Sequence, residues 1–177
     1  MKRNYTFIPL FLLLFVAVVA CSNNSKSATA ESEGKKPEKV VNVPQFDADS
    51  AYHYVKAQVD FGPRVPNTEA HKACGEYLAK KLEQFGAKVY NQKVDLIAYD
   101  GTMLKARNII GAYKPESKKR IALFSHWDSR PWADADPDAK NRHTPILGAN
   151  DGASGVGVLL EIARQIQQQQ PELGIDI

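Results

Sequence analysis

Histidine and aspartate side chains occur in two polar segments in the second half of the chain. One segment, residues 125–129, reads Ser-His-Trp-Asp-Ser, and the other, residues 148–155, contains Asp151. Imidazole nitrogens and carboxylate oxygens are ligands that zinc binds in proteins. A carboxylate two residues from a histidine can also orient its imidazole, as metal-ligating histidines require. The two segments therefore predict half of a zinc site, with His126 and Asp151 as candidate ligands and Asp128 as the supporting carboxylate.

A strand should position the first of these segments. Residues 121–124, Ile-Ala-Leu-Phe, form a short continuous apolar run, which is typical of a strand buried on both faces of a parallel sheet. Ligands of open α/β sheets gather at the carboxyl ends of the strands. We therefore expect His126 and Asp128 to project from the edge of the sheet where chemistry usually occurs.

A helix should follow the second segment. Small residues at 152–157 are followed by apolar residues at helical spacing up to Ile166. Asp151 then lies at or just before the helix N-terminus, where aspartate is a favoured N-cap residue. A helix cap therefore explains Asp151, taken alone, as well as a metal ligand does, and a structural histidine explains His126 alone better than a ligand does.

The two segments together resemble a known family. Residues 125–136 read SHWDSRPWADAD and residues 147–164 read LGANDGASGVGVLLEIAR. This order is similar to that of the zinc aminopeptidase superfamily, and within it resembles most the animal-type glutaminyl-peptide cyclotransferases that also occur in bacteria. The resemblance runs from about Phe46 to Ile177. It implies an α/β fold, a three-layer α/β/α sandwich with a mixed central sheet, of which residues 46–177 would be the N-terminal part.

The resemblance also implies roles for individual residues. Asp151 matches a zinc ligand of the superfamily. His126 matches a residue that binds metal in the two-zinc aminopeptidases but lies near the metal without ligating it in the single-zinc cyclotransferases, and Asp128 would support it. Trp127 and Trp132 would line the substrate pocket, although ordinary packing explains them equally well.

The ligand set of this chain is incomplete. A catalytic zinc takes about three protein ligands and an open position, and these residues supply at most two. Residues 173–177 are expected to begin another buried strand, which in the superfamily ends in an acidic pair that provides a base and a further ligand. We therefore expect the catalytic residues to lie beyond Ile177, and the 177-residue chain to be an inactive portion of a longer protein.

Three functions are compatible with these motifs. The first is a zinc-dependent cyclotransferase that converts the N-terminal Gln of a peptide substrate to pyroglutamate and releases ammonia. The second is a two-zinc aminopeptidase that hydrolyses N-terminal residues. The third is an inactive, lipid-anchored binding module without metal. Zinc content, zinc stoichiometry and the reaction product separate the three.

The N-terminal segment predicts export and lipidation. Residues 1–20 carry Lys2 and Arg3 and then an apolar run that is too short for a typical membrane span but suits a signal peptide. The run ends in Val-Val-Ala before Cys21, which resembles the lipobox of bacterial lipoproteins. We expect Cys21 to carry a lipid, residues 21–45 to form a flexible tether, and the protein to face the periplasm or the cell exterior. A plain secretory signal is the alternative.

Charge gives no support for binding to nucleic acid. Removal of residues 1–20 takes away two of the 23 basic side chains and none of the 20 acidic ones, so the net charge falls from +3 to +1. The remaining basic residues alternate with acidic ones and form no aromatic-basic platform.

The remaining elements follow from hydrophobic spacing and turn signals. Helices are expected near 47–59 and 68–85, and strands near 89–98 and 104–111. Cys74 lies on the apolar face of the second helix, so it should be a small buried side chain rather than a reactive thiol. The other histidines, His53, His71 and His143, lack a paired acid and are expected to be solvated.

Overall fold

The computed structural model describes residues 42–177. The predicted signal peptide, the lipidation site at Cys21 and most of the predicted tether lie outside these residues. The helices are α1 (Ala48–Val59), α2 (Glu69–Gln84) and α3 (Gly155–Gln168), and a kinked turn, η1 (Ala149–Ser154), precedes α3. The strands are β1 (Lys88–Ile97), β2 (Met103–Tyr113), β3 (Arg120–Ala122) and β4 (Gly174–Asp176).

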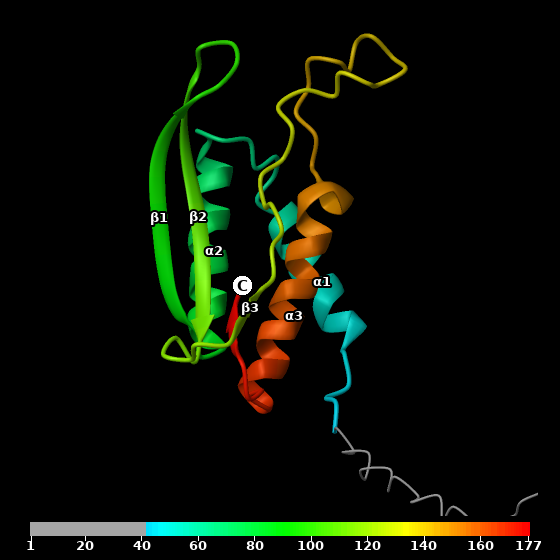
Figure 1. The fold of residues 1–177 in the computed structure, drawn as a ribbon. Coiled ribbons are helices and arrows are strands. Elements are labelled where there is room, and N and C mark those ends of the chain that lie inside the picture. The colour runs from blue at the N-terminus through cyan, green and yellow to red at the C-terminus, as the bar shows by residue number, and fades with distance from the viewer. Residues whose placement is uncertain (1–41) are drawn as a thin grey trace, which may run out of the picture. The chain divides into compact units, whose positions relative to one another are not determined.

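The strands form one mixed sheet in the order β1-β2-β4-β3 (Figure 1). β1 and β2 form a long antiparallel hairpin whose register runs from Lys88 opposite Ala112 to Ile97 opposite Met103. β4 pairs antiparallel with β2 and parallel with β3. The structure thus confirms the mixed sheet and the strands expected near 89–98, 104–111 and 173–177.

Side-chain caps fix where the first two helices begin. The Asp47 carboxylate accepts a hydrogen bond from the Ser50 N–H at 3.0 Å, and the Thr68 hydroxyl accepts one from the His71 N–H at 3.2 Å. Such caps satisfy backbone donors that have no partner within the helix. Both helices predicted from the sequence are confirmed within a residue of their expected bounds.

The core lies where α2 and α3 meet the sheet. α2 packs along the β1–β2 hairpin, and α3 packs against α1 and also contacts α2. The main core cluster takes its buried side chains from α2, α3, β2, β4 and the residue before β1: Cys74, Leu78, Leu82, Ala87, Tyr113, Val156, Leu160, Ala163, Ile166 and Ile175. Cys74 is fully buried, and burial raises the pKa of its thiol to about 12. Its predicted role as a small core side chain is confirmed.

One expectation about the sheet is wrong. The apolar run 121–124 was expected to form a strand buried on both faces, but β3 ends at Ala122 and is an edge strand of the described sheet. Two side chains of the run are open to solvent: Ile121 is 45% exposed and Phe124 is 89% exposed. The reason is that β3 packs mainly on its neighbour β4, and no helix of residues 42–177 packs broadly over its faces. None of the helices in these residues is long and apolar enough to cross a membrane.

Candidate functional site

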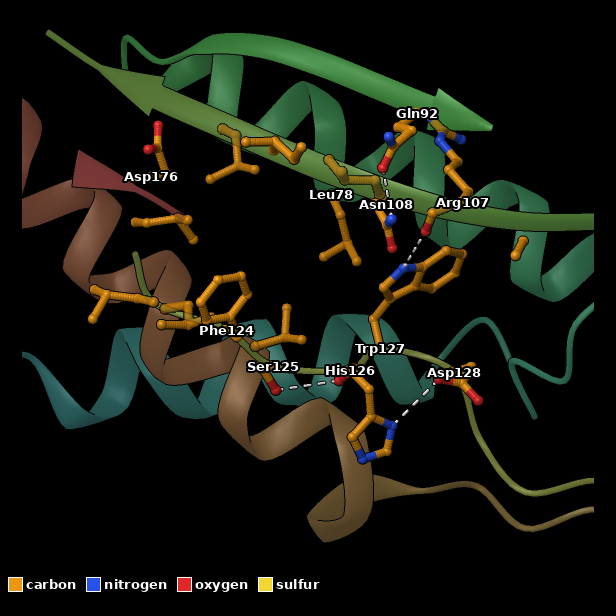
Figure 2. Close-up of a pocket in the computed structure, with 18 of the residues that line it drawn as sticks. Leu78, Gln92, Arg107, Asn108, Phe124, Ser125, His126, Trp127, Asp128 and Asp176 are labelled. Atoms are coloured by element: carbon orange, nitrogen blue, oxygen red, sulfur yellow. Dashed lines mark hydrogen bonds and ion pairs between the residues drawn. The ribbon is translucent and has the colours of Figure 1, made fainter. Parts of the chain in front are cut away.

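The chain leaves β3 in an extended conformation that carries His126 away from the sheet edge. Leu123 still donates its N–H to the Asp176 carbonyl at 2.8 Å, so the segment is held beside β4 for one further residue. Figure 2 shows the His126 ring turned away from β2, whereas the ring of Trp127 points toward it. The alternation of an extended chain thus sends neighbouring side chains in opposite directions.

The kinked turn η1 places Asp151 opposite His126. Asp151 has φ −85° and ψ 100°, which are not helical values, and Gly152 has φ +101°. A Cβ atom on Gly152 would lie 2.8 Å from the Asp128 carbonyl oxygen and 3.1 Å from Cε1 of His126. Glycine is therefore needed at position 152 both for its backbone conformation and for the close approach of the two segments.

The three predicted site residues come together. His126 Nε2 lies 2.9 Å from Asp151 Oδ1, and His126 Nδ1 lies 3.3 Å from Asp128 Oδ1. All three side chains are about half exposed, so solvent reaches the group. A neutral imidazole carries a proton on one nitrogen only and can donate to one of the two carboxylates at a time. The histidine is therefore oriented by an acid on each side.

The cap explanation of Asp151 does not match the observed contacts. The N-cap residue of α3 is Ser154, whose side chain makes no capping hydrogen bond. Asp151 lies three positions before that cap, and its carboxylate contacts the His126 ring. Asp151 thus faces the candidate site and not the end of the helix.

The donors fit zinc in kind and in spacing. Two donors on one tetrahedral zinc lie roughly 3.3 Å apart, given zinc–ligand distances of about 2.0–2.1 Å. The observed 2.9 Å between His126 Nε2 and Asp151 Oδ1 is close to that separation. Their number is insufficient, because residues 42–177 bring no three His, Cys, Asp or Glu side chains together as a metal-binding group. His126 and Asp151 would thus provide part of a zinc site.

The two tryptophans occupy different surroundings. The Trp127 ring stacks on His71, with a centroid distance of 4.0 Å and an interplanar angle of 17°. Its Nε1–H donates to the Arg107 carbonyl at 3.4 Å, and its outer edge packs against Gly75. Trp132 is 48% exposed and lies edge-on to His143.

A cavity of about 760 Å³ opens beside the candidate site. Its walls come from α2, β2, α3 and the segment that follows β3, and His126, Trp127 and Asp128 line it (Figure 2). Apolar side chains such as Leu78, Leu123 and Leu160 contribute much of the remaining lining. A concave apolar site with a few polar groups on one side is typical of a ligand pocket.

Sequence reasoning missed Arg64, which is fully buried. Its guanidinium donates to the carbonyl oxygens of Trp127 and Gly148 at 3.0 and 2.8 Å, and burial lowers its pKa while the charge of Asp128 opposes that shift. The sequence places Arg64 in a Gly-Pro-Arg turn that looks solvated. The sequence signal that could have indicated its burial is the position of this cation between two prolines of a loop, Pro63 and Pro66.

His71 is also in a different environment from the one expected. It was predicted to be solvated, but it is only 8% exposed, because its ring stacks on the Trp127 ring at the start of α2. Burial lowers its pKa, the charge of Asp128 opposes the shift and Arg107 adds to it. The prediction was wrong because the stacking partner lies 56 positions away in the sequence and was not paired with it.

Comparison with known proteins shows which family this fold resembles. Residues 108–177 match the model of Peptidase family M28. The mixed sheet and its helices are therefore aminopeptidase-like, and the expected fold class is confirmed.

Solved structures narrow the resemblance. The chain is 83% identical to a leucine aminopeptidase precursor from Bacteroides thetaiotaomicron over 78% of this chain and 48% of that one, with a TM-score of 0.77. It is also 83% identical to a glutaminyl cyclase of the same organism, solved with bound N-acetylhistamine. That match covers 77% of this chain and 47% of the cyclase, with a TM-score of 0.76. A glutaminyl cyclase from Tannerella forsythia is 62% identical over 76% of this chain and 46% of that one, with a TM-score of 0.75.

These matches confirm the resemblance to bacterial glutaminyl cyclases that was inferred from the sequence. The chain spans about half the length of each of these proteins.

Proposed function

We propose that the protein is a zinc-dependent glutaminyl-peptide cyclotransferase, which closes the N-terminal Gln of a peptide into pyroglutamate and releases ammonia. The observation that carries the proposal is the identity of 83% and 62% to two glutaminyl cyclases. The 2.9 Å approach of His126 Nε2 to Asp151 Oδ1 supports a metal at this place. His126 is one of the residues that line an apolar cavity large enough for a side chain of a peptide substrate.

The residues of this chain would hold and orient the metal. Asp151 would ligate zinc through a carboxylate oxygen, and His126 would lie beside it, held by Asp128 on its other nitrogen. When bound, zinc would act as a Lewis acid toward the γ-carboxamide of the substrate. The apolar side chains of Leu78, Leu123 and Leu160 in the cavity wall would contact the apolar part of a bound substrate.

A second function is favoured by the same distance. Because His126 Nε2 and Asp151 Oδ1 are spaced almost as two ligands of one ion, His126 is placed to be a true ligand, as in a two-zinc aminopeptidase. A leucine aminopeptidase precursor and a Zn-dependent exopeptidase are among the similar structures. This alternative predicts two zinc ions per chain and a free N-terminal residue as product.

The test uses the protein expressed from its own gene, after the reading frame has been sequenced across codon 177. Zinc is counted by mass spectrometry of the purified protein, and a peptide with N-terminal Gln is assayed for ammonia and for pyroglutamate. One zinc per chain with release of ammonia supports the cyclotransferase. Two zinc ions with release of free Gln support the aminopeptidase, and a folded protein that holds no zinc at neutral pH contradicts both and leaves a binding module.

We also propose that the protein is a lipoprotein anchored to the cell envelope through Cys21. The support is the apolar run and the lipobox-like residues before Cys21. Replacement of Cys21 by Ser should move the protein from the membrane fraction to the soluble fraction and abolish labelling by a fatty-acid analogue. Membrane retention of the variant would overturn this assignment.

A further inference from the structure

Arg64 is a buried cation whose hydrogen-bond acceptors are main-chain carbonyls. Its Nε donates to Trp127 O at 3.0 Å, and its Nη2 donates to Gly148 O at 2.8 Å. Its Nη1 bonds to three further carbonyls, those of Gln58, Gly62 and Leu147. A buried charge is costly unless it is well satisfied, so such an arrangement indicates a residue that fixes the backbone around it.

The acceptors of Arg64 belong to both segments that carry the candidate ligands. Trp127 lies between His126 and Asp128 in the His126 turn, defined here as residues 125–129. Gly148 begins the Asp151 turn, defined here as residues 148–152. One guanidinium therefore joins the backbone of the two turns at the level of the candidate site.

The main chain of Arg64 adds to this connection. The Ser129 N–H donates to the Arg64 carbonyl at 3.2 Å, so the His126 turn is bonded to Arg64 in both directions. Gly148 has φ +58°, and a Cβ on it would lie 3.1 Å from Nη2 of Arg64. Glycine at 148 thus leaves room for the guanidinium between the turns.

We propose that Arg64 is a positioning residue that sets the distance between His126 and Asp151 before zinc binds. The inference rests on the proposed function, because it concerns the metal of that site. Arg64 does not contact the metal donors themselves and acts through the carbonyls of Trp127 and Gly148. A lysine offers three N–H donors on one nitrogen and cannot reproduce all five contacts, whereas the planar guanidinium spreads five N–H donors over three nitrogens.

Arg64→Lys tests the proposal against a matched control, Glu161→Gln. Glu161 is likewise fully buried and charged, and its bonds go to Arg164, Gln165 and the Asp47 N–H, none of which lies in either turn. Zinc dissociation constants are measured by competition with a chelator, using the protein expressed from its own gene and shown to be folded by circular dichroism. We expect Arg64→Lys to weaken zinc binding by about 10- to 100-fold and Glu161→Gln by less than about threefold. Equal effects of the two variants, or no effect of Arg64→Lys, would overturn the proposal.

Hydrogen exchange of the unsubstituted protein gives a test that needs no variant. The Ser129 N–H bonds to Arg64, and the Ala153 N–H bonds to the Gly148 carbonyl that Arg64 also holds. If Arg64 sets the turns in advance, both amides are protected from exchange without zinc, and added zinc changes them little. Free exchange that becomes slow when zinc is added would show that the metal assembles the turns, which contradicts the proposal.

Failure of the proposed function has a different signature. In that case the unsubstituted protein binds no zinc, while the amides of Ser129 and Ala153 are protected and lose protection in Arg64→Lys. That result would limit Arg64 to joining the turns and would overturn its role toward zinc.

Discussion

His126 Nε2 and Asp151 Oδ1 lie 2.9 Å apart although 25 positions separate the two residues in the sequence. The approach depends on residues that carry no metal donor themselves. Gly152 leaves room for the His126 ring, and Arg64 joins the backbone of both turns. The spacing of the donors is thus a property of the folded turns.

Replacement of Gly152 by Ala should destabilise the protein and separate the two turns. The added Cβ would lie 2.8 Å from the Asp128 carbonyl at a backbone φ of +101°. Strained backbone and overpacking each cost about 1–3 kcal/mol, so we expect a loss of about 2–6 kcal/mol in the free energy of unfolding, measured in urea.

Gly101→Ala is the control for this variant. Gly101 has φ +86° and no atom within 4 Å of the position of a Cβ, so its replacement reports the backbone cost alone. The difference between the two variants then measures the close approach at Gly152. Equal losses in the two would show that the contact with the His126 turn carries no energy.

Replacement of Asp128 by Asn should weaken zinc binding. The Asp128 carboxylate lies 3.3 Å from Nδ1 of His126, and loss of such a supporting acid typically lowers metal affinity or activity about 10- to 100-fold. The measurement is the zinc dissociation constant from chelator competition with the protein expressed from its own gene. Asp134→Asn serves as control, since Asp134 pairs with exposed Arg130 and has no contact with His126. Unchanged affinity in Asp128→Asn would remove this residue from the site.

The sequence was sufficient for the features that depend on local spacing. The bounds of α1 and α2 and the buried face of α2 with Cys74 follow from residues a few positions apart. The meeting of His126 and Asp128 with Asp151 was also expected, because strand ends and the loops of an α/β sheet gather at one edge.

Features that depend on distant partners could not be predicted in the same way. The burial of Arg64 is determined by carbonyl groups at positions 127, 147 and 148, and backbone acceptors leave no mark in a sequence. The stacking of His71 on Trp127 likewise joins residues of different elements. The exposure of Phe124 was missed because an apolar run does not reveal which other parts of the chain pack over it.

Replacement of Thr68 by Ala should shorten α2 at its N-terminus. The Thr68 hydroxyl accepts from the His71 N–H at 3.2 Å, and loss of such a cap costs about 1 kcal/mol. Urea unfolding measures the loss, and Thr68→Ser should retain most of the stability because serine caps a helix as well as threonine does. A cost in Thr68→Ser as large as that in Thr68→Ala would show that the methyl group, and not the cap, stabilises this end.

The stack of His71 on Trp127 should make stability depend on pH near neutrality. Burial lowers the pKa of His71 in the folded protein, the charge of Asp128 opposes this shift and Arg107 adds to it. As the pH falls through the ordinary histidine pKa of about 6.5, the unfolded chain takes up a proton before the folded one does. The free energy of unfolding should therefore decrease below about pH 7 and continue to fall until the folded pKa is passed.

His71→Phe tests this relationship, because phenylalanine can stack on Trp127 and does not titrate. We expect the free energy of unfolding of this variant, measured in urea, to vary less between about pH 7.5 and pH 5.5 than that of the unsubstituted protein. His143→Phe controls for the removal of a histidine, since His143 is exposed in a loop beside Trp132. If His71→Phe keeps the full dependence of stability on pH, the proton is taken up by another group. If His71→Phe loses that dependence and His143→Phe retains it, protonation of His71 in the buried stack accounts for the dependence of stability on pH.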